Sequence, residues 1–228
     1  MLIKNRVFAL ALRAVGVVVS ISGILATMWT PRGFAVGALL YYTLLSNIAV
    51  TAYFVATSAL TARALKRDGL RGSPSFFPKT SMVLAVDILL TMMVYWLMLA
   101  PTFFTMGSNI SIFSYGNVVA HTVTPLLMIF DYLLLNERGA IKAKHSFLVL
   151  LFPFAYVVFA VILEAAGYVF YVDVATGRAV HAPYYFLDIE RSGFMVVVYL
   201  LVILVFLLIF GYLCYLLDRK RGNEGRER

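Results

Sequence analysis

Thr43 and His121 are two side chains with the chemistry of an acyl-transfer site, and each lies inside its own apolar stretch of the sequence. A hydroxyl becomes a nucleophile when a neighbouring base takes its proton, and histidine can be that base. At the 1.5 Å rise of a helix, both side chains fall roughly 8–9 Å inside the same boundary of a membrane. The sequence therefore suggests a Thr43 nucleophile with His121 as its general base.

Other polar residues fall at a similar depth and could complete such a site. Glu164 is the carboxylate that we expect to orient the imidazole. Asn47, Asn117 and Ser46 are candidate donors to an oxyanion or contacts to a substrate. The ordinary alternative stays open, because a membrane threonine often bonds to its own helix and a buried histidine can simply be a packing residue.

These side chains must be positioned by membrane helices. Of the 228 residues, 62% are hydrophobic and 13% are charged, and the mean hydropathy is +0.91. Since a spanning helix needs about 20 apolar residues, we expect six helices in one bundle, an all-α membrane protein. Small residues in the first span, Gly16, Ser20 and Gly23, predict close helix contact there. The expected spans are about 7–29, 38–62, 81–101, 115–136, 146–170 and 192–217.

The basic residues predict the topology of this bundle. With both termini in the cytoplasm, 16 of the 19 Lys and Arg residues face the cytoplasm, and Arg32, Arg178 and Arg191 face the other side. The net charge of +8 is thus explained by topology, and we expect no nucleic-acid partner. We predict a multi-pass protein, in the cell membrane, with a transmembrane domain (1–217) and a basic cytoplasmic tail (218–228).

Three ionisable residues in the spans fall together near the cytoplasmic third: Arg13, Asp87 and Asp131. Charges inside a membrane are costly unless they pair. We expect these three to form a structural charge cluster, and a proton or cation path is the alternative. The lone Cys214 excludes a disulfide framework and a thiol-based metal motif.

Three segments carry a family resemblance that covers nearly the whole chain. Tyr41–Asn47 contains a Thr-x-x-Ser-Asn element, His121–Pro125 a His-x-x-x-Pro element followed by Asp131, and Pro183–Asp188 a late aromatic element. In this order, across six spans, they resemble the androgen-induced (FAR-type) integral-membrane family and its bacterial relatives. The late element departs from the pattern at Tyr185, where proline is expected.

The resemblance implies a threonine-dependent hydrolase of fatty acid esters of hydroxy fatty acids, with Thr43 as nucleophile and His121 as base. The roles of Glu164 and the asparagines do not follow from it. We expect a lipid ester that enters from the bilayer, no cofactor and no metal. Two alternatives remain: a non-catalytic lipid-handling protein, and a metal-dependent hydrolase using His121, His181 and Glu164 or Asp188.

Overall fold

Six helical segments of the computed structural model are long and apolar enough to cross a membrane, among the residues that it describes (3–30, 33–105, 111–173 and 176–224). The segments are Arg6–Met28, Tyr42–Asp68, Pro78–Thr102, Tyr115–Leu135, Ala143–Ala165 and Met195–Arg219. In lipid a helix satisfies its backbone hydrogen bonds internally, which is why apolar runs of this length fold as helices. The prediction of six helices long and apolar enough to span a membrane is confirmed.

Several spans are composed of more than one helical element. The helical elements are α1 (Arg6–Met28), η1 (Val36–Leu40), α2 (Tyr42–Asp68), α3 (Pro78–Val94), η2 (Tyr95–Leu99), α4 (Ala100–Thr105), α5 (Tyr115–Val118), η3 (Val119–Val123), α6 (Thr124–Leu135), η4 (Ala143–Leu150), α7 (Leu151–Ala165), η5 (Tyr185–Leu187), α8 (Ile189–Ser192) and α9 (Met195–Glu224). The strands β1 (Trp29–Thr30) and β2 (Gly33–Phe34), and β3 (Tyr171–Val172) and β4 (Ala179–Val180), form two short antiparallel hairpins that the sequence did not predict.

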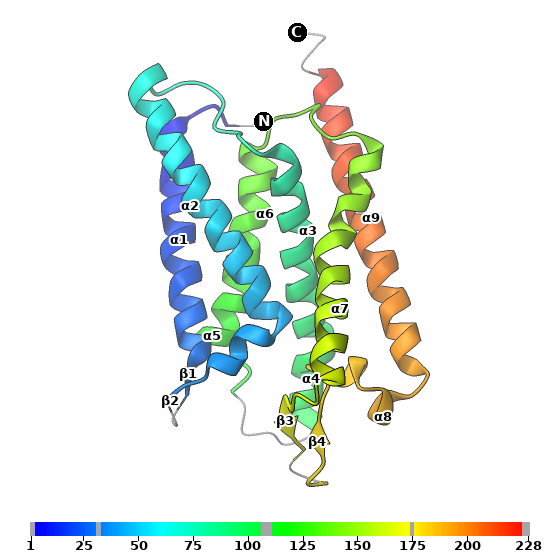
Figure 1. Ribbon diagram of the computed structural model, residues 1–228. Helices are drawn as coiled ribbons and strands as arrows, with labels where there is room; N and C mark the ends of the chain where they lie inside the picture. The colour runs from blue at the N-terminus through cyan, green and yellow to red at the C-terminus, as the bar shows by residue number, and fades with distance from the viewer. Residues whose placement is uncertain (1–2, 31–32, 106–110, 174–175, 225–228) are drawn as a thin grey trace.

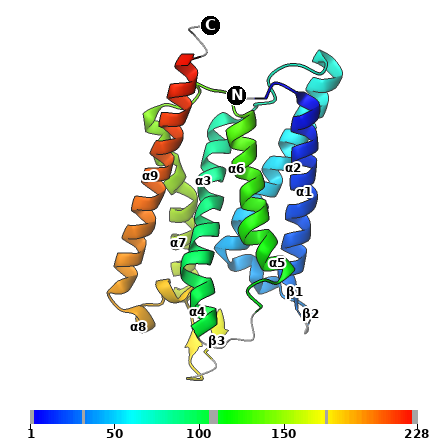
Figure 2. The same ribbon diagram turned by 180° about the vertical axis from the view of Figure 1, so that it is seen from behind.

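The long helices run along a common axis, and the two chain termini lie at the same end of the bundle (Figures 1 and 2). Both hairpins lie at the opposite end, beside the start of α2. The bundle therefore has a terminal end and a hairpin end.

Small residues allow α1 to approach its neighbours closely, as the sequence predicted. A Cβ atom at Gly16 would lie 2.7 Å from the Phe54 ring of α2, and one at Gly23 would collide with Val119 of η3. Between these glycines the Thr51 hydroxyl donates to Ser20 Oγ at 2.8 Å. These contacts join α1, α2 and the fourth span into one packed unit.

Helix boundaries differ from the expected spans in two places that matter. The second span was expected from residue 38, but η1 ends at Leu40, Tyr41 has extended backbone (φ −89°, ψ 142°), and α2 begins at Tyr42. At the other end of the chain, α9 continues to Glu224, across the expected domain boundary at residue 217. Asp218 is fully buried there and accepts a hydrogen bond from the Ile141 N–H at 2.9 Å.

Candidate active site

Thr43 lies in the first turn of α2 rather than deep within a helix, because the chain breaks at Tyr41. The first N–H groups of a helix have no partner within it and carry the positive end of the helix dipole. Thr43 thus presents both a side-chain hydroxyl and a backbone N–H with no acceptor within α2 at the hairpin end of the bundle. Its place in the first turn of α2 gives Thr43 a polarity that a mid-helix threonine would lack.

Two π-helical turns position His121. One is η3, which contains His121, and the other is η2, which begins at Tyr95. Single π-helical turns within α-helices are frequent at functional sites because they re-aim side chains. The Tyr95 ring stacks on the imidazole with centroids 3.8 Å apart, and Trp96 Nε1 donates to Thr122 Oγ1 at 2.9 Å. The ring stacking and this hydrogen bond therefore fix the two π-helical turns relative to each other.

The structure brings the Thr43 hydroxyl to the imidazole of His121. Thr43 Oγ1 lies 3.3 Å from His121 Nε2, and the Asn117 carbonyl oxygen lies 3.0 Å from Nδ1. A carbonyl can only accept, so Nδ1 carries the proton and Nε2 is free to accept the Thr43 hydroxyl. The imidazole is 6% exposed. This is the tautomer that a general base requires.

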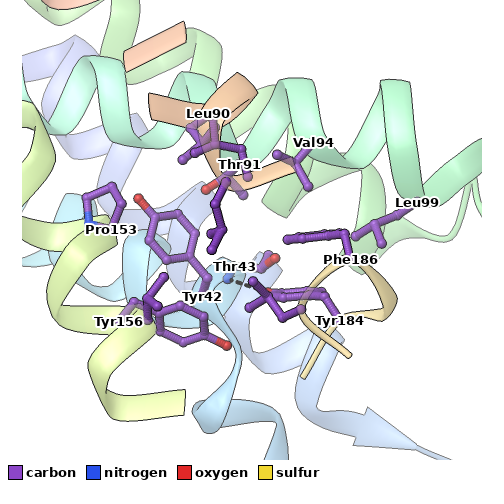
Figure 3. A pocket seen from close by; sticks show the side chains of 14 residues that line it. Tyr42, Thr43, Leu90, Thr91, Val94, Leu99, Pro153, Tyr156, Tyr184 and Phe186 are labelled. Atoms are coloured by element: carbon purple, nitrogen blue, oxygen red, sulfur yellow. Dashed lines mark hydrogen bonds between the residues drawn. The ribbon is translucent and has the colours of Figure 1, made fainter. Parts of the chain in front are cut away.

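An apolar pocket with a cavity volume of about 60 Å³ opens beside Thr43 (Figure 3). Residues of α2, α3, η2, α7, α9 and the Tyr184–Leu187 segment line it. Its polar side chains include Thr43 and Thr91, and the remainder is mostly aliphatic and aromatic. A small number of placed polar groups on an apolar wall is typical of sites that bind hydrophobic ligands.

The Tyr184 hydroxyl lies at the N-terminus of α2. The Thr43 backbone N–H donates to its hydroxyl oxygen at 3.4 Å (Figure 3), and that hydroxyl also contacts the Tyr42 N–H and the Thr43 side chain. Burial raises the pKa of Tyr184 above its ordinary value of 10.0, so the hydroxyl keeps its proton at neutral pH. It also contacts the Tyr156 hydroxyl, so Tyr184 belongs to a hydrogen-bond network at the first turn of α2, beside Thr43.

Asn47 and Ser46 bond to the Thr43 backbone, and neither lines the pocket. The Asn47 side-chain amide donates to the carbonyl oxygens of Thr43 (2.7 Å) and Ala120 (3.1 Å). Ser46 Oγ donates to the Thr43 carbonyl at 3.0 Å and lies 3.0 Å from Thr91 Oγ1. Because both amide hydrogens of Asn47 are already used, this side chain joins α2 to η3 and leaves no donor for an oxyanion.

The structure does not bring Glu164 to the imidazole. It lies exposed in the last turn of α7, and the Asn117 carbonyl takes the place at Nδ1 that the carboxylate was expected to fill. The Asn117 side chain itself donates to the Ser111 carbonyl at 3.0 Å, away from Thr43. Asn117 therefore contributes through its backbone, and no carboxylate is hydrogen-bonded to the imidazole within the described part of the chain.

Two of the three residues in the expected charge cluster form a buried ion pair. Arg13 Nε donates to Asp131 Oδ1 at 2.7 Å, and the Tyr53 hydroxyl donates to Asp131 Oδ2 at 3.0 Å. Arg13 Nη1 is satisfied by Thr61 Oγ1 and the Pro74 carbonyl. Asp87 does not join them: neither of its carboxyl oxygens has a hydrogen-bond partner among the described residues. The expected cluster is therefore an Arg13–Asp131 ion pair supported by neutral hydrogen-bond partners, without Asp87.

The residues of the alternative metal site are not gathered. Within the described part of the chain, no three His, Cys, Asp or Glu side chains are close enough to hold a metal ion. His181 Nδ1 lies 2.9 Å from the Tyr168 carbonyl oxygen, and Asp188 forms an ion pair with Arg178. His181 and Asp188 therefore already have polar partners in the loop region at the hairpin end.

Sequence reasoning missed Tyr95, Thr91 and the role of Tyr184. An aromatic residue in a membrane helix carries no sign that it will stack on a histidine of another helix. The Pro183–Asp188 segment was visible as an aromatic element, but nothing in its spacing indicated contact with Thr43. Only the folded chain brings these residues together.

Comparisons with known proteins give no independent assignment: no family model, curated protein or solved structure matches the chain.

Proposed function

We propose that this protein is an intramembrane lipid ester hydrolase with Thr43 as nucleophile and His121 as general base. The contact between Thr43 Oγ1 and His121 Nε2, with Thr43 on the wall of an apolar pocket, carries the proposal. The resemblance to the androgen-induced (FAR-type) family supports the same two roles and the class of substrate, a fatty acid ester.

Acylation begins when Thr43 Oγ attacks the ester carbonyl and its proton passes to His121 Nε2. The 3.3 Å separation is loose, as is common before a substrate binds. The tetrahedral intermediate then breaks the ester C–O bond, and the imidazolium gives its proton to the leaving alkoxide. Without a carboxylate at Nδ1, the Asn117 carbonyl dipole and the Tyr95 ring face stabilise the charged imidazole.

Deacylation uses water and the same base. His121 takes a proton from water as the water oxygen attacks the acyl-threonine, and then returns the proton to Thr43 Oγ as the fatty acid leaves. In both steps the oxyanion forms next to the start of α2. We assign the Tyr184 hydroxyl and the Thr43 N–H as its donors. The Thr43 N–H donates to the Tyr184 oxygen at 3.4 Å without a substrate and would exchange this long bond for one to the oxyanion, and the helix dipole favours negative charge at that end.

The site is proposed to open on the non-cytoplasmic side of the membrane. Thr43 lies toward the hairpin end of the bundle, opposite the termini, and the positive-inside bias assigns the termini to the cytoplasm. The pocket is lined by α7 and α9 residues such as Pro153 and Ile203. An acyl chain can therefore reach it from the lipid, while water reaches Thr43 from the outer surface.

Intact-mass spectrometry after exposure to a fluorophosphonate probe tests the proposal. Thr43 Oγ displaces fluoride from phosphorus only if a base takes its proton, so wild type should gain one adduct at Thr43. Thr43→Ala and His121→Ala should gain none. Thr57→Ala is the matched control, because this buried threonine of α2 donates only to backbone carbonyls of its own helix.

No adduct on folded wild-type protein would remove the catalytic assignment. Copurified lipid that leaves unchanged would then favour the second candidate, a non-catalytic lipid-handling protein that uses the same apolar pocket.

A further inference from the structure

Asp87 is a buried ionisable group that the proposed hydrolysis does not use. It lies in the middle of α3 and is 1% exposed, and both carboxyl oxygens lack a hydrogen-bond partner among the described residues. Arg13, the cation expected beside it, bonds instead to Asp131, Thr61 and Pro74. A buried polar group without a partner requires an explanation, and in a membrane helix it marks a functional site by default.

A second unpartnered group lies on the pocket wall, beside residues of the same helix as Asp87. The Tyr42 hydroxyl is buried without a hydrogen-bond partner among the described residues. The Tyr42 ring lines the pocket and extends toward Leu90 and Pro153, away from Tyr184 (Figure 3). Leu90 and Thr91 of the pocket wall are on the same helix as Asp87, less than two turns further along. Tyr42 therefore lies at the end of the pocket formed by Leu90 and Pro153, and Asp87 lies about one helical turn before Leu90 and Thr91 on α3, behind the pocket lining.

The chemistry of the two groups restricts what could satisfy them. An unpaired carboxylate in an apolar interior costs so much free energy that the group takes a proton instead. A neutral carboxylic acid and a phenol each offer one donor and one or more acceptors. The matching ligand group is uncharged and both gives and accepts a hydrogen bond, as a hydroxyl does.

We propose that Asp87 and Tyr42 form a second polar site in the pocket, which binds an uncharged hydroxyl group. In an empty pocket the hydroxyl is that of water, and in an occupied pocket it is that of a lipid with a hydroxylated alkyl chain. This site uses the same pocket but takes no part in the reaction at Thr43. The proposal can therefore be tested independently of the proposed hydrolysis.

Labelling with dicyclohexylcarbodiimide tests the state of Asp87. This apolar reagent adds to a protonated carboxylic acid, and the adduct rearranges to an N-acylurea that keeps all atoms of both reactants. We expect one adduct at Asp87, lost in Asp87→Asn, and none at Asp131, whose carboxylate is paired with Arg13. Thr43→Ala should label like wild type. Absence of an Asp87 adduct on folded protein would overturn the proposal.

Protection from labelling tests the ligand. We expect n-dodecanol to protect Asp87 at a concentration about tenfold lower than n-dodecane, the effect of a single buried hydrogen bond of typical strength. Tyr42→Phe should remove this difference while labelling persists. Equal protection by n-dodecanol and n-dodecane would overturn the assignment of a lipid hydroxyl as the ligand and leave water as the occupant. Stronger protection by n-dodecylamine would overturn the neutral acid, because an ammonium group prefers a carboxylate.

Discussion

The phenol ring of Tyr95 lies flat against the imidazole of His121, with ring centroids 3.8 Å apart and planes that differ by 17°. Each residue lies in a π-helical turn, and the Tyr95 hydroxyl is anchored on the Ile112 carbonyl at 2.7 Å. The stack leaves the imidazole little freedom to turn about its own bond. His121 Nε2 therefore stays directed at Thr43 while Nδ1 stays on Asn117.

Loss of the stacked Tyr95 ring is expected to lower the reactivity of the Thr43 hydroxyl. Tyr95→Leu should lower the rate of fluorophosphonate labelling at Thr43 about tenfold, because an aromatic pair is worth about 0.5–1.5 kcal/mol beyond burial. Tyr95→Phe is the matched control, since it keeps the ring and loses only the hydrogen bond to Ile112. It should label at the wild-type rate. Labelling of Tyr95→Leu at the wild-type rate would show that the stack has no positioning role.

Removal of the Tyr184 hydroxyl is expected to affect turnover rather than binding. Tyr184→Phe keeps the ring contacts with Tyr41 and Phe186 but removes the oxyanion donor. Hydrolysis of p-nitrophenyl laurate should fall about 10²-fold in kcat with little change in KM. Tyr185→Phe, one residue further, should hydrolyse the ester like wild type. A change confined to KM would assign Tyr184 to substrate binding instead.

The Arg13–Asp131 pair is expected to be structural. Asp131→Asn leaves the guanidinium of Arg13 buried without its counter-charge, and should lower the free energy of unfolding by about 3–5 kcal/mol. Arg13→Leu combined with Asp131→Leu should recover most of this loss, because no unpaired charge remains. Thermal unfolding in detergent measures both. Fluorophosphonate labelling that disappears in the folded double variant would indicate a functional role for the pair.

Close packing at Gly23 is expected to support the π-helical turn that holds His121. Gly23→Ala adds a methyl group against Val119, which adjoins Ala120 and His121 in η3. Overpacking of this kind costs about 1–3 kcal/mol, so both the unfolding temperature and the labelling of Thr43 should fall. Val119→Ala in the same chain should restore them by making space. If the double variant remained as impaired as Gly23→Ala, the contact would not be the cause.

Much of the fold follows from the sequence for simple reasons. Apolar runs of sufficient length specify spanning helices whatever surrounds them. Arg13 and Asp131 were expected together, and they are paired, since neither charge is tolerable alone in lipid. Thr43 and His121 were expected at one depth, and they are in contact, although Thr43 arrives there through a later helix start than expected.

The direction in which each side chain points was decided only by the tertiary structure. A membrane helix is apolar on all sides because lipid is as apolar as the protein core, so its hydropathy does not reveal which face is buried. Depth alone therefore grouped Glu164 with His121 and Asp87 with Arg13, whereas the folded chain leaves Glu164 exposed and Asp87 without a partner. The break at Tyr41 and the π-helical turns around Tyr95 and His121 interrupt apolar stretches whose hydropathy does not mark them. The sequence thus determined which polar residues share a membrane level, and the packing determined which of them meet.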